Sequence, residues 1–161
     1  MPGASAFPRT LALALSLAAV LWTAALVFAT VGPTRGIASF TPGVVNAVSS
    51  VVCHRRPERS FHVDSRQFPV CGRCTGLYVA GALGAIAGWF GAARAPRRTR
   101  RLMIWAALPT AVSVGAEWAG LYDGSTALRA LLAVPLGATA GWVFVRMLRA
   151  ESAPSTCAMI A

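Results

Sequence analysis

Four long stretches with few or no charged side chains constrain this chain more than any other feature of its sequence. They run from about 10 to 31, 75 to 93, 102 to 122 and 127 to 148. Each supplies the roughly 20 apolar residues that a helix needs to cross a bilayer. Only 12% of the 161 residues are charged, against about 25% in soluble domains. The sequence therefore predicts an all-α integral membrane protein with four transmembrane helices in a single membrane domain, 1–161, and excludes a soluble Rossmann or barrel enzyme.

The first apolar stretch and the last residues of the chain each carry a signal of their own. The first apolar stretch resembles a cleaved signal peptide at Val27-Phe28-Ala29, whose small-residue spacing a signal peptidase accepts. The length of the apolar run and the single charge before it, Arg9, favour a retained membrane helix instead. The last residues, 151–161, are predicted to be a disordered tail.

The charge distribution predicts an orientation. The chain carries fifteen basic residues, all arginine, and five acidic ones, for a net charge of +10. Most arginines lie in loops at the ends of the apolar stretches without interleaved aromatic residues, so no nucleic-acid partner is expected; the expected partner is the lipid bilayer. Residues 94–101 include five arginines, the mark of a cytoplasmic connection. Both termini are then cytoplasmic, and segment 33–74 lies on the outer side, although it holds six arginines of its own.

The outer segment and the apolar stretches carry two further structural signals. Residues 37–52 are apolar but interrupted by Pro42 and Gly43, too short and polar to span, and are predicted to form a re-entrant or interfacial helix. The spacings Gly84-x-x-x-Gly88 and Gly137-x-x-x-Gly141 allow helix backbones to approach closely.

Three of the four cysteines and both histidines of the chain fall within this outer segment, 33–74. Cys71 and Cys74, two residues apart, can turn both sulfurs to one side, as structural zinc sites require. Cys53 with His54, or with His62 as the alternative, completes a Cys₃His set. Thiolates with imidazole suit zinc, copper or iron. The pattern predicts a transition-metal site.

Two other interpretations of the cysteines stay open. Cys71 and Cys74 precede an apolar helix, and a helix N-terminus beside Arg73 favours a reactive thiolate, as in a membrane thiol-disulfide oxidoreductase. A quinone or a partner protein would then take the electrons. Alternatively, Cys53 forms a structural disulfide that staples a docking loop of an accessory subunit in a membrane complex. Whether the protein is an enzyme is left open.

Charged residues near the cysteines predict an adjacent anion or substrate site. Arg59 and Arg73 flank the thiols and are suited to bidentate binding of an anion, although Glu58 and Asp64 are near enough in sequence to pair with them. Glu117 stands in the third apolar stretch, where a charge is costly and points to function. Its expected partner is Arg129.

These residues resemble the signature of a family of small bacterial membrane proteins, domain of unknown function 2085. The signature consists of Cys-His, Arg-Ser-Phe and Cys-x-Arg-Cys-Thr-Gly-x-Tyr, found here at 53–54, 59–61 and 71–78. The family also has an acidic residue, usually Asp, where this chain has Glu117, and then an arginine and glycines that match Arg129, Gly137 and Gly141. The resemblance implies a multi-pass protein of the bacterial cell membrane whose Cys, His and Arg residues form one functional site.

Overall fold

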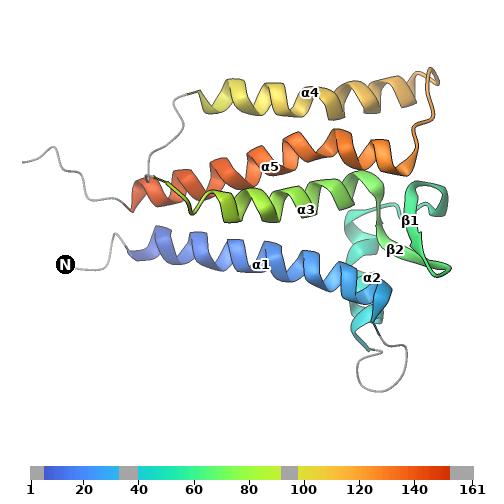
Figure 1. Ribbon diagram of the computed structural model, residues 1–161, viewed down its shortest axis with the longest axis horizontal. Helices are drawn as coiled ribbons and strands as arrows, with labels where there is room; N and C mark the ends of the chain where they lie inside the picture. The colour runs from blue at the N-terminus through green and yellow to red at the C-terminus, as the bar shows by residue number, and fades with distance from the viewer. Residues whose placement is uncertain (1–5, 33–39, 92–97, 153–161) are drawn as a thin grey trace, which may run out of the picture.

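The protein is mostly helical, as the sequence predicts. The computed structural model describes residues 6–32, 40–91 and 98–152. In chain order these form α1 (Ala6–Val31), α2 (Phe40–Val52), the short 3-10 helix η2 (Pro57–Arg59), β1 (Ser60–Val63), β2 (Arg66–Cys71), α3 (Gly72–Ala87), α4 (Thr99–Trp118) and α5 (Thr126–Glu151). Helices α1, α3, α4 and α5 run alongside one another, and α2 and the two strands gather at one end of them (Figure 1).

Each of the four apolar stretches forms a helix, but the helices differ in length and polarity. Among the described residues, two helices are long and apolar enough to cross a membrane: Phe7–Val31, with 25 residues, and Thr126–Glu151, with 26. Helix α3 has 16 residues, about 24 Å at 1.5 Å per residue, which is shorter than a hydrocarbon core of about 30 Å. Helix α4 includes Arg100, Arg101 and Glu117. Length and composition thus support two of the four predicted crossings.

Helices α3 and α5 pack against each other more extensively than any other pair of described elements. At five glycines of this pair, a Cβ atom would run into the backbone of the other helix: Gly72, Gly76, Gly84, Gly137 and Gly141. Small residues let membrane helices approach in this way, as the glycine spacings predict. Ser125 precedes α5 as its N-cap, and its hydroxyl accepts a hydrogen bond from the Leu128 amide at 3.3 Å, as is typical of this position. The helix continues through Glu151, and residues from 153 onward lie outside the described residues.

The segment expected to be a loop, 33–74, contains a helix and a β-hairpin. Residues 33–39 lie outside the described residues, and α2 occupies most of the predicted interfacial helix. Strands β1 and β2 pair antiparallel, with Val63 opposite Arg66. Between them Asp64 and Ser65 have φ of +46° and +65°, and positive φ at both central residues defines the type I′ turn of tight hairpins. The sequence analysis missed this hairpin.

A small apolar core attaches the hairpin to α1 and α2. Its buried members include Val70 in β2 and Leu26 in α1, which are 0% and 1% exposed, together with Val45 of α2 and Phe68. Cys53 belongs to the same core, and Cys71 and Cys74 pack against it. Burial of these side chains stabilises the position of the hairpin against the two helices. The core therefore fixes where the cysteines meet.

Candidate functional site

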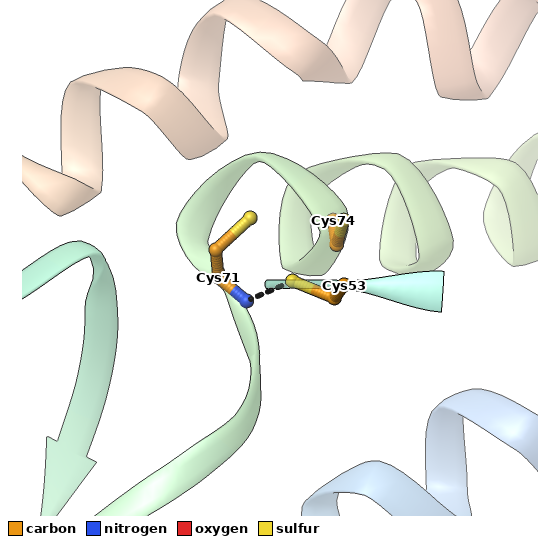
Figure 2. Close-up of side chains that lie close together, drawn as sticks. All are labelled: Cys53, Cys71 and Cys74. Carbon is orange, nitrogen blue, oxygen red and sulfur yellow. Dashed lines mark hydrogen bonds between the residues drawn. The ribbon is translucent and has the colours of Figure 1, made fainter. Parts of the chain in front are cut away.

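Three cysteines from three different elements converge where the hairpin meets α3. Cys53 follows the last residue of α2, Cys71 ends β2, and Cys74 lies in the first turn of α3. Their sulfur atoms all lie within 4.8 Å of one another. Figure 2 shows the three side chains grouped around the start of α3. Cys53 is buried and the other two are partly buried, and all three are free thiols. The structure thus brings together every cysteine of the predicted metal site.

Hydrogen bonds at this cluster favour the thiolate of Cys71 and keep Cys74 a thiol, because the hydrogen bond between the two side chains lowers the pKa of Cys71 and raises the pKa of Cys74. The backbone N–H of Cys71 donates to the sulfur of Cys53 at 3.3 Å (Figure 2). A hydrogen bond from the Cys74 thiol lowers the pKa of Cys71 to about 5 from an ordinary value of 9.0, against the opposing effect of burial. Donors aimed at a sulfur stabilise its negative charge, and the thiolate is the form of cysteine that binds a metal or attacks a disulfide.

The sulfur positions suit a tetrahedral metal ion. With Zn–S bonds of about 2.3 Å, sulfurs in a tetrahedral site lie about 3.8 Å apart. The largest separation here is below 4.8 Å, so a movement of about 1 Å or less completes the geometry. Neither histidine belongs to the group. His54 is exposed but lines the same cavity as the cysteines, whereas His62 is on the exposed side of β1.

The side chains of three arginines contact the carboxylate of Glu117. The carboxylate accepts hydrogen bonds from Arg73 at 2.6 Å and from Arg129 at 2.9 Å, and Arg59 approaches it at 3.8 Å. The side chains of Glu117 and Arg129 are only 5% and 4% exposed. Glu117 thus pairs with Arg129 as its position predicts. Arg59 and Arg73 also pair with Glu117, rather than with Glu58 or Asp64.

This ion cluster joins three helices at the cysteine end of the bundle. Arg73 belongs to α3, Glu117 to α4 and Arg129 to α5. Arg129 also donates to the exposed Asp123 at 2.5 Å, and Arg73 also donates to the Ser113 hydroxyl at 2.9 Å. Burying charge is costly unless partners surround it, and each charge here has at least one. The cluster fixes Arg73, and therefore the start of α3, beside α4 and α5.

A cavity of about 540 Å³ connects the cysteines with the arginines. Its lining includes the three cysteines, His54, Trp118 and five arginines: Arg55, Arg56, Arg59, Arg73 and Arg129. The sequence predicted Arg59, Arg73 and Arg129 as site residues, and it offered Arg55 and Arg56 only as contacts for lipid phosphates. The sequence analysis missed Ser113 and Asp123, although Ser113 precedes Glu117 by four residues and so shares its helix face.

The comparisons with known proteins agree with the signature in the sequence. Residues 53–143, more than half of the chain, match the family of domain of unknown function 2085, described as a predicted membrane protein. An uncharacterized protein of Methanothermobacter thermautotrophicus is 29% identical over 86 residues, 53% of this chain and 78% of that protein. An uncharacterized protein of Methanocaldococcus jannaschii is 37% identical over 59 residues, 37% of this chain and only 38% of its own length.

These matches refine the resemblance. No solved structure matches the chain. Both relatives are archaeal, so they leave the implied bacterial origin unconfirmed. The matched region begins at Cys53 and extends beyond Glu117, Arg129 and Gly141, so it contains the whole cysteine cluster and the ion cluster. The chain belongs to the DUF2085 family of predicted membrane proteins.

Proposed function

We propose that this protein is a small multi-pass membrane protein that holds a transition metal ion, zinc, copper or iron, through Cys53, Cys71 and Cys74. The convergence of three sulfurs within 4.8 Å carries this proposal. The N–H donor to Cys53 and the thiolate character of Cys71 support it further, because metal ligands must be deprotonated. His54 is the proposed fourth ligand, since it lines the cavity shared by the cysteines, and His62 is the alternative.

Four crossings of the membrane fit the arrangement of the long helices. Their outward surfaces carry many large apolar side chains, among them Leu17 and Leu21 of α1, Trp105 and Val112 of α4, and Leu131 of α5. Apolar surface on this scale marks contact with lipid or with a membrane partner. Helix α1 also supplies Leu26 and Ala29 to the core around the cysteines, which supports its retention rather than its removal as a signal peptide.

The arginines at the opposite end of the bundle support cytoplasmic termini. The start of α1, the start of α4 and the end of α5 lie at the same end (Figure 1). These segments carry Arg9, Arg98, Arg100, Arg101, Arg146 and Arg149. Since positively charged segments stay on the cytoplasmic side, the cysteines would face outward from the cell membrane.

Elemental analysis of the detergent-purified protein tests the metal site. Wild type is compared with Cys71→Ser, and Cys157→Ser serves as the matched control because it removes the fourth cysteine of the sequence and keeps Cys53, Cys71 and Cys74. We expect about one metal ion per chain in the wild type and in the control, and loss of the ion in Cys71→Ser. His54→Ala should weaken metal binding more than His62→Ala. Absence of stoichiometric metal from protein purified under both reducing and aerobic conditions would contradict the proposal.

The low pKa of Cys71 beside Cys74 favours a second candidate, a membrane thiol-disulfide oxidoreductase. Closing a disulfide between them releases two electrons and two protons, which a quinone or a partner's disulfide would accept. Counting free thiols in the samples used for elemental analysis separates the two functions. Metal-free protein that lacks two thiols as purified, and regains them on reduction, would support the redox function over the metal site.

A further inference from the structure

The cavity beside the cysteines carries more positive charge than its neighbouring carboxylates balance. Five arginines line it, whereas the acidic partners of these arginines are Glu117 and Asp123. Arg55 is held by the side chain of Asn46 at 2.7 Å, a neutral partner. Arg56 is an exposed residue, and its side chain has no ion pair with a carboxylate among the described residues. Unbalanced charge of this size attracts a ligand with more than one negative charge.

Two of these arginines also have a buried donor that lacks an acceptor. Among the described residues, four buried side-chain polar atoms lack a hydrogen-bond partner, and two of them are the Nε–H groups of Arg55 and Arg73. A buried donor without an acceptor destabilises the folded state, more so when it is charged. Both residues also line the cavity, so its positive charge is not fully satisfied by the protein's own acceptors.

The backbone of Arg55 has a conformation that is unfavourable for an arginine. Arg55 has a φ of +46°, in the left-handed region that non-glycine residues rarely adopt. Its carbonyl accepts a hydrogen bond from the Gln67 side chain at 2.8 Å, and its guanidinium is held by Asn46. Surrounding structure therefore maintains an unfavourable backbone conformation, as is common at ligand sites.

We propose that this cavity binds the phosphate group of an anionic ligand through Arg55, Arg56 and Arg73. Guanidinium groups form paired hydrogen bonds to phosphate oxygens, and a phosphate dianion matches the excess of positive charge better than a single carboxylate does. The cavity volume of about 540 Å³ lies within the range of small-molecule sites, about 300–1,000 Å³, so it admits a group attached to the phosphate. A soluble phosphate ester and a lipid headgroup at the membrane surface share this chemistry.

Binding of inorganic phosphate to the detergent-purified protein, measured by isothermal titration calorimetry, tests the proposal. Arg56→Gln is the test variant because this exposed side chain has no structural partner among the described residues. Arg9→Gln is the matched control, an exposed arginine at the other end of the bundle. We expect Arg56→Gln to weaken binding by about tenfold or more, Arg56→Lys to restore part of the loss because it keeps the charge, and Arg9→Gln to bind like wild type.

Two further arms identify the source of the phosphate and separate this site from the metal site. Competition with phosphatidic acid in nanodiscs, against phosphatidylcholine alone, shows whether a lipid headgroup occupies the cavity; either source supports the proposal. Repeating the titration on wild-type protein from which a chelator has removed any metal should leave binding intact. Phosphate binding that is equal in Arg56→Gln and wild type, that disappears when metal is removed, or that is absent for both probes would overturn the proposal.

Discussion

Replacing Glu117 by glutamine should destabilise the protein far more than its small change in shape suggests. The carboxylate accepts hydrogen bonds from Arg73 at 2.6 Å and Arg129 at 2.9 Å, and both Glu117 and Arg129 are almost fully buried. Glutamine keeps the size of the side chain but leaves the arginine charges without their shared counter-ion. Removing one partner of a buried ion pair costs about 3–5 kcal/mol. We therefore expect Glu117→Gln to lower the free energy of unfolding by about 3 kcal/mol or more.

The matched control is Asp123→Asn, which removes the other acidic partner of Arg129. The Asp123 side chain is 90% exposed, so water replaces the lost interaction, and pairs of this kind contribute about 1 kcal/mol or less. Unfolding of both variants in mixed micelles of increasing denaturing detergent, followed by circular dichroism, gives the two differences directly. Equal losses of stability in the two variants, or a loss below about 1 kcal/mol for Glu117→Gln, would refute the reasoning that burial makes this cluster important.

Two further substitutions test the packing. Gly84→Ala places a methyl group against a backbone carbonyl of α5 and should lower the free energy of unfolding by about 1–3 kcal/mol through overpacking. Gly115→Ala in α4 is the control: its methyl group meets no atom within 4 Å, so the free energy of unfolding should be unchanged or raised. Leu26 is 1% exposed in the core behind the hairpin, so Leu26→Ala should lower the free energy of unfolding by about 2–5 kcal/mol and increase hydrogen exchange in β2. Leu21→Ala is the control, because Leu21 is 66% exposed. Unchanged exchange in β2 would show that this core does not fix the hairpin.

Much of the fold follows from local sequence. The four apolar stretches become α1, α3, α4 and α5 because the polar backbone groups of an apolar run form their hydrogen bonds best within a helix. The glycines that allow α3 and α5 to approach are visible as spacings of four residues. The hairpin was missed because its only strong signal is the two-residue turn at Asp64 and Ser65, which lacks the glycine that usually marks a type I′ turn.

The concentration of cysteines, histidines and arginines between 53 and 78 pointed to a candidate site from sequence alone. The tertiary structure decided which of them meet. Spacing left Cys53 open to partnership with either later cysteine, and the core around Leu26 and Val70 brings all three sulfurs together. Arg55 and Arg56 follow Cys53 and His54 directly in the sequence, but their place in the lining of the cavity depends on the turn from α2 into the hairpin. The sequence determined which chemical groups are present and where the helices form. Long-range packing determined the distances between the chemical groups, because residues far apart in the chain meet only when all the elements pack together.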